Sequence, residues 1–138
     1  MEEFVQRYEA AWASREKGAM KPLWHEDGTL YHPILSEPIP GRLVPANNDR
    51  TKATTPGFKW TLIQWGGHGD VVFLEWQNDA IINDKPMSWN GVDRMILKGG
   101  KIWEETVYFD THKIWAALDP AMDKGALVDA KTLESYEE

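Results

Sequence analysis

Three polar residues have side chains suited to acid–base chemistry and lie in segments that otherwise read as structured and apolar. Tyr8 falls within the apolar stripe of the first segment, His32 directly precedes Pro33, and Asp93 lies in the stretch GVDRMIL. An imidazole can accept or donate a proton near neutral pH. A phenol or a neutral carboxyl can donate a hydrogen bond to a developing oxyanion. Together these residue types suit proton transfer beside a carbonyl group.

Asp93 has the most informative surroundings of the three. Strand alternation places it on one face with Trp89, Gly91, Met95 and Leu97. A carboxyl on such an apolar face should have a raised pKa, because loss of water disfavours its charged form. The alternative is a solvated face on which Asp93 pairs with an arginine or lysine, such as Arg94.

Tyr8 and His32 each have an ordinary structural interpretation as well. Tyr8 is spaced at helical intervals from Val5, Ala11 and Trp12, so it could be a core residue whose hydroxyl has one partner. His32 could be a surface residue at the end of a strand. Neither residue indicates a function by its own pattern.

Composition limits the classes of function. The chain has 138 residues, of which 42% are hydrophobic and 27% charged, so we expect one globular domain spanning residues 1–138. A net charge of −7 disfavours nucleic acid and anionic membranes as partners. There is no cysteine, no metal-binding motif and no phosphate loop, so we expect neither a metal nor a cofactor. The acidic N-terminal segment is unlike a signal peptide, which is compatible with a cytoplasmic location.

The elements that must position these side chains can be read from periodicity and turn residues. We expect helices at 3–17 and 19–25, a short strand at 28–32, and a loop over 34–56 containing a short helix at 43–53. Four strands follow at 58–66, 70–82, 87–98 and 101–110, joined by short turns as an antiparallel meander. A helix at 112–118 precedes an acidic tail, 119–138, that is either loosely ordered or packed on a partner. Helices first and an antiparallel sheet after them indicate an α+β domain.

Three segments carry a family resemblance: VQRYEAAW at 5–12, LWHEDGTLYHPILSEPIPG at 23–41 and WNGVDRMILKGGKIWEETVYFD at 89–110. They are similar to the nuclear transport factor 2-like superfamily, which includes the SnoaL-like and ketosteroid isomerase-like domains. The likeness covers roughly residues 4–118 and is weakest over 42–70. It implies a cone-shaped, curved antiparallel sheet packed by N-terminal helices around a deep pocket.

The resemblance also implies roles for the three polar residues, which we expect to meet inside that pocket. By analogy with ketosteroid isomerase, Tyr8 and Asp93 would be the two donors to an enolate oxygen, and His32 takes the position of the catalytic base. That base is an aspartate in the steroid isomerases, so the substitution leaves proton transfer open but puts steroid isomerisation itself in doubt. The acid–base positions of limonene epoxide hydrolase correspond to Trp76, Asn78 and Val107, which implies that epoxide hydrolysis is absent.

Further residues of the pocket follow from the same pattern. Glu105 and Phe109 would face the inside of the cone, where Glu105 would be a second acid–base group or a partner for His32. The alternative is an exposed glutamate beside Glu104. The indoles expected in the pocket wall, each of which could equally belong to the core or to a dimer interface, are Trp24, Trp60, Trp76 and Trp89.

The resemblance favours a cofactor-free isomerase, cyclase or dehydratase. Its substrate would be hydrophobic, carbonyl-bearing and cyclic, of polyketide or steroid type. The alternative is a non-catalytic small-molecule-binding or accessory protein of the same fold. In either case we expect a homodimer, because relatives commonly pair through the outer face of the sheet.

Overall fold

The sheet carries most of the structure. The computed structural model describes residues 1–123 and 130–136. Six strands lie in the order β2-β1-β6-β5-β4-β3, with the bounds β1 Trp24–Tyr31, β2 Ile39–Pro40, β3 Lys59–His68, β4 Val71–Ile82, β5 Lys85–Lys98 and β6 Lys101–Tyr108. Strands β3 to β6 form the antiparallel meander that the turn residues predict. The expectation of a wholly antiparallel sheet is wrong at one place, because β1 runs parallel to β6.

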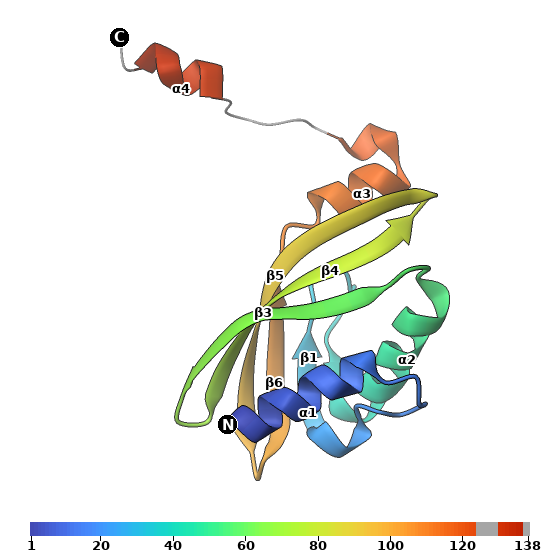
Figure 1. Ribbon diagram of the computed structural model, residues 1–138, viewed down its shortest axis with the longest axis vertical. Coiled ribbons are helices and arrows are strands. Elements are labelled where there is room, and N and C mark those ends of the chain that lie inside the picture. Colours follow the sequence, from blue (N-terminus) through green and yellow to red (C-terminus); the bar gives the residue numbers. More distant parts are fainter. Residues whose placement is uncertain (124–129, 137–138) are drawn as a thin grey trace.

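The helices lie against the curved sheet (Figure 1). Helix α1 (Glu2–Ala13) and helix α2 (Val44–Thr54) lie on its concave side, and α3 (His112–Leu118) lies at the end of the β4–β5 hairpin. A short helix, α4 (Ala130–Tyr136), lies apart from the sheet in the same view. This arrangement is the α+β cone expected from the sequence. None of the helices in the described part of the chain is long and apolar enough to cross a membrane.

The segment between α1 and the sheet differs from the sequence prediction. Helix α1 ends at Ala13 rather than at residue 17, because Ser14 adopts an extended conformation with ψ of 142°. The predicted helix at 19–25 is only a single 3₁₀ turn, Lys21–Leu23, with Pro22 in its first turn. Strand β1 therefore begins at Trp24, four residues earlier than expected, and Trp24 lies on a strand rather than on a helix.

The turns of the meander agree with the sequence. Asn83 and Asp84 both have positive φ, 52° and 65°, which is the conformation of a two-residue hairpin turn. Gly99 and Gly100 have φ of 61° and 78° between β5 and β6. Residues that tolerate left-handed backbone thus fix the register of the two long hairpins.

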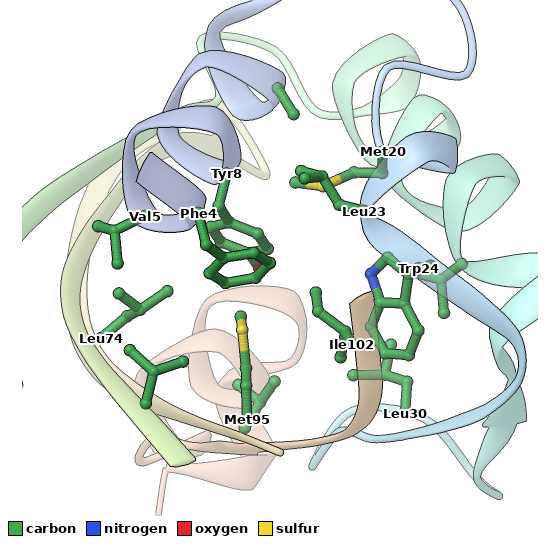
Figure 2. Close-up of a cluster of buried hydrophobic side chains, with 14 of the residues drawn as sticks. Phe4, Val5, Tyr8, Met20, Leu23, Trp24, Leu30, Leu74, Met95 and Ile102 are labelled. Carbon is green, nitrogen blue, oxygen red and sulfur yellow. The ribbon is translucent and has the colours of Figure 1, made fainter. Parts of the chain in front are cut away.

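A hydrophobic core lies beneath α1 (Figure 2). Val5 and Tyr8 project from α1 toward the sheet, where Leu74 and Met95 are fully buried. Trp24 closes the core from the side of β1. Some members of this core, among them Tyr8, Trp24 and Trp76, also line a cavity, so the core forms part of the cavity wall.

Candidate functional site

A cavity of about 620 Å³ opens between the sheet and helices α1, α2 and α3. A volume of this size is typical of small-molecule sites. Its lining includes all nine residues that the sequence proposed for the site: Tyr8, Trp24, His32, Trp60, Trp76, Trp89, Asp93, Glu105 and Phe109. The chain therefore brings the predicted residues to one place, although they come from α1, five strands, and the segments that follow β1 and β6.

Tyr8 lies at the centre of the polar part of the cavity. Its hydroxyl oxygen is 3.3 Å from Oδ2 of Asp93 and 3.1 Å from Oε1 of Glu105. Only 3% of Tyr8 is exposed, and its ring meets that of Trp60 edge-on with the centroids 5.5 Å apart. One hydroxyl thus joins two acidic side chains that come from neighbouring strands of the sheet.

Asp93 lies on the inner face of β5, as strand alternation predicts. The indole nitrogen of Trp76 donates a hydrogen bond to its Oδ1 at 2.9 Å. Arg94, the cation that could have neutralised it, belongs to the opposite face and lies 3.7 Å from Glu104. Among the described residues no lysine, arginine or histidine forms an ion pair with Asp93, so the interpretation of a solvated, cation-paired aspartate is not supported.

Glu105 is buried, and its interpretation as an exposed neighbour of Glu104 is wrong. It lies opposite Met95 in the β5–β6 pair, on the face that also carries the buried Val107. A shift of register leaves Trp103 without a partner on β5. Its indole meets the ring of His25 edge-on and contacts Nζ of Lys98, and it does not line the cavity. The bulge at Trp103 interrupts the alternation of β6. Glu105 is the acidic side chain of this strand that lines the cavity.

Burial dominates the electrostatics of the two acids. It raises the pKa of Asp93, although the neighbouring Glu105, the indole of Trp76 and the hydroxyl of Tyr8 favour its charged form. Burial, followed by the negative charge of Asp93, raises the pKa of Glu105 well above its ordinary value. Burial and both carboxylates likewise raise the pKa of Tyr8. Loss of water around both acids therefore favours a state in which the pair still holds a proton at a pH where free carboxyls are charged.

His32 lines the cavity but has different partners from those expected. Its Nδ1 accepts a hydrogen bond from the backbone N–H of Ile34 at 3.2 Å, and its ring meets Phe109 edge-on with centroids 5.4 Å apart. The hydrogen-bonding neighbours of Glu105 in the described chain are Tyr8 and Asp93, and not His32. Burial lowers the pKa of His32 to about 4, so its ring is neutral at pH 7.

Aromatic rings form the walls around these polar groups. Phe109 lies between Trp76 and Trp89, with ring centroids 5.8 and 6.4 Å away. Trp12 stacks on Trp60 at 6.1 Å and also lines the cavity, a role that the sequence reading did not give it. Its position one helical turn after Tyr8 is the signal that could have placed it there.

The residues that could hold a metal ion do not gather in this site. No group of three or more histidine, aspartate or glutamate side chains in the described ranges is arranged to bind one. What the arrangement offers instead is a pair of buried acids, a phenol and a neutral imidazole inside an aromatic cavity. Such groups can exchange protons with a bound molecule and hydrogen-bond its oxygen atoms.

Comparison with known proteins gives a consistent result. A family model described as SnoaL-like domain matches residues 5–105. Among solved structures, a protein with ketosteroid isomerase-like fold from Catenulispora acidiphila, in complex with trimethylamine, has a TM-score of 0.76 and 21% identity, over 90% of this chain and 98% of its own. TerC co-crystallised with polyporic acid has a TM-score of 0.72 and 15% identity, over 85% and 96%.

A third similar structure is that of an enzyme. An epoxide hydrolase from M. tuberculosis, similar to limonene epoxide hydrolase, has a TM-score of 0.69 and 18% identity, over 84% of this chain and 86% of its own. Identities this low show the fold alone. A search of curated proteins found no match.

Proposed function

Because the chain belongs to the SnoaL-like domain family, we propose that it is a cofactor-free acid–base enzyme acting on a hydrophobic, carbonyl-bearing, cyclic molecule. The observation that carries this proposal is the contact of the Tyr8 hydroxyl with both Asp93 and Glu105 on the wall of an aromatic cavity. Two acids with raised pKa values beside each other favour a state in which one is neutral and the other charged. Such a pair can donate one proton and accept another.

The proposed substrate follows from the cavity's shape and lining. Indole and phenyl rings on several sides favour a flat or polycyclic body. The polar groups are gathered around Tyr8, so a carbonyl oxygen placed there could receive hydrogen bonds from the phenol and from a neutral carboxyl. This is the environment in which a proton on the carbon beside the carbonyl becomes removable.

The role proposed for His32 changes with its surroundings. The sequence analysis predicted that His32 moves the proton. Because Nδ1 accepts the Ile34 N–H, the neutral ring carries its proton on Nε2 and can donate a hydrogen bond there. With a pKa of about 4 it would also be a weak base at neutral pH. We therefore propose that His32 orients a substrate oxygen.

Deuterium exchange tests the proposal without knowledge of the natural substrate. The protein is incubated in D₂O with 2-tetralone or anthrone, and proton NMR follows loss of the signals beside the carbonyl. Exchange should be faster with the wild type than without protein, and about 10²-fold or more slower in Tyr8→Phe and Asp93→Asn. Tyr108→Phe, on the outer face of β6, is the matched control.

Deuterium exchange together with tryptophan fluorescence distinguishes an enzyme from a binding protein. If no ketone exchanges but polyporic acid or a ketone quenches the tryptophan emission, the chain is a ligand-binding protein of this fold. The homodimer and the cytoplasmic location stay predictions.

A further inference from the structure

The polar cluster has fewer protons than its contacts require. The Tyr8 hydroxyl carries one proton, yet its oxygen lies within hydrogen-bond distance of two carboxyl groups. If both acids were charged, one of them would face the lone pairs of the Tyr8 oxygen with no hydrogen between them. A buried contact of that kind is strongly unfavourable. At least one of the two carboxyls should therefore hold a proton and donate it toward Tyr8.

The remaining contacts indicate which acid holds that proton. Asp93 accepts the indole N–H of Trp76 on Oδ1 and has Tyr8 at Oδ2, so each of its oxygens has a donor. Glu105 has the Tyr8 hydroxyl at Oε1 and the Asp93 carboxyl as its hydrogen-bonding neighbours, and no cation in the described chain forms an ion pair with it. Two donors stabilise a carboxylate, and their absence favours the neutral acid. The negative charge of Asp93 raises the pKa of Glu105, which agrees with this assignment.

We propose that Glu105, Tyr8 and Asp93 form a proton relay that holds one proton between its two carboxyls, with Glu105 as the resting acid and Asp93 as the resting base. In the resting state Glu105 donates to the Tyr8 oxygen, and Tyr8 donates to Asp93. The proton can cross when Glu105 gives its proton to the Tyr8 oxygen while Tyr8 gives its own to Asp93. Tyr8 is neutral before and after, and the negative charge moves from Asp93 to Glu105.

The relay completes the chemistry of the proposed function, on which this inference rests. The Asp93 carboxylate would take the proton from the carbon beside the carbonyl, and Glu105 would protonate the carbonyl oxygen. The product is an enol, with Asp93 neutral and Glu105 charged. Asp93 then passes its proton to the Tyr8 oxygen as Tyr8 passes its own to Glu105, which restores the resting state without any proton from solvent.

Carbon NMR of labelled side-chain carboxyls tests the resting state without a ligand. In the wild type near pH 7, Glu105 should give the signal of a neutral acid and Asp93 that of a carboxylate. Tyr8→Phe removes a donor from Asp93, so the midpoint of the Asp93 titration should move about one pH unit or more upward. Tyr108→Phe should leave it in place. Two charged carboxyls in the wild type, a neutral Asp93 beside a charged Glu105, or an unmoved midpoint in Tyr8→Phe would each overturn the relay.

Hydrogen–deuterium exchange of a ketone then tests the relay and the proposed function separately. Glu105→Gln keeps the shape of the side chain but cannot return a proton, so exchange should fall by about 10²-fold. If the wild type exchanges 2-tetralone and Glu105→Gln does so at the same rate, the relay is wrong and the proposed function stands. If no ketone exchanges while NMR finds the shared proton, the proposed function fails and the relay remains as a resting property of the site.

Discussion

The indole nitrogen of Trp76 lies 2.9 Å from Oδ1 of Asp93, on the neighbouring strand of the sheet. Trp76 lies directly opposite Gly91 in the β4–β5 pair, and Asp93 is two residues further along the same face. A Cβ atom at position 91 would overlap the six-membered ring of Trp76. The missing side chain of Gly91 therefore lets the indole lie across β5 and point its N–H at Asp93.

Gly91→Ala should disturb this arrangement. The added methyl group has no space, so either the indole or the β5 backbone must move. We expect a loss of about 1–3 kcal/mol in the free energy of unfolding, measured by urea denaturation. The pKa of Asp93 should rise further in the carboxyl NMR titration, because the Trp76 N–H no longer stabilises the charged form.

Gly66→Ala provides a comparison for the same substitution on a strand. Gly66 lies on β3, where a Cβ atom would meet nothing within 4 Å. Its effect on unfolding should stay within about 0.5 kcal/mol. Equal stability of the two alanine variants would show that the indole does not depend on the space at Gly91.

Glu105→Gln should make the protein more stable at neutral pH. Burial raises the pKa of Glu105, so the native state keeps a proton that the unfolded chain releases above about pH 4. Stability from this group is complete at low pH and falls as the pH rises toward the folded pKa. Glutamine does not ionise, so the free energy of unfolding should no longer decrease with pH through this group. We expect Glu105→Gln to gain about 1–2 kcal/mol in the free energy of unfolding at pH 8, measured by urea denaturation.

The pH dependence is the decisive part of that comparison. The difference between Glu105→Gln and the wild type should be smallest near pH 4 and should grow with pH. A difference that is constant over this range would mean that Glu105 is not held neutral in the native state. Glu104→Gln, at the half-exposed neighbour on the opposite face, should show no such trend.

The homodimer can be tested on the outer face of the sheet. Phe73 on β4 is 46% exposed and Tyr108 on β6 is 56% exposed, with the partly buried Val92 on the strand between them. If the sheet pairs with a second copy there, Phe73→Asp combined with Tyr108→Glu should convert a dimer into a monomer in light scattering after gel filtration. A charge at the exposed Leu133 on α4 should leave the mass unchanged. A wild type that is already a monomer would contradict the dimer.

Much of the fold could be predicted because its signals are local. The turns at Asn83-Asp84 and Gly99-Gly100 need residues that tolerate positive φ, and they bracket the long strands correctly. The misplaced segment lies between Ser14 and Trp24. In this segment Met20 and Leu23 are spaced as they would be on a helix. They are buried because they pack into the core, although the segment forms only a single 3₁₀ turn. Tertiary packing determines the conformation of this segment, and the periodicity of apolar residues does not reveal tertiary contacts.

The site was predictable as a set of residues but less so as an arrangement. Alternation on β5 and β6 correctly places Asp93 and Glu105 on inner faces. The contact of both with Tyr8 depends on how α1 crosses the sheet, for which the sequence has no local signal. The prediction that Glu105 is exposed was based on its neighbour Glu104. Burial depends instead on which of these two adjacent residues faces the cavity, and that residue is Glu105. Adjacent residues of a regular strand face opposite sides, so composition alone cannot choose between the two acids.

His32→Gln should reduce the sensitivity of the fold to acid. Burial lowers the pKa of His32 to about 4, so between about pH 6.5 and 4 the unfolded chain binds a proton that the native state does not. This group's contribution is therefore complete above the unfolded pKa and is lost on acidification, by at most about 3 kcal/mol. Urea denaturation at pH 7.5 and 4.5 should show a smaller loss in His32→Gln than in the wild type, whereas the exposed His68→Gln should follow the wild type. An unchanged loss in His32→Gln would mean that the imidazole can be charged in place, and it would restore His32 as a candidate for the base that the sequence reading made it.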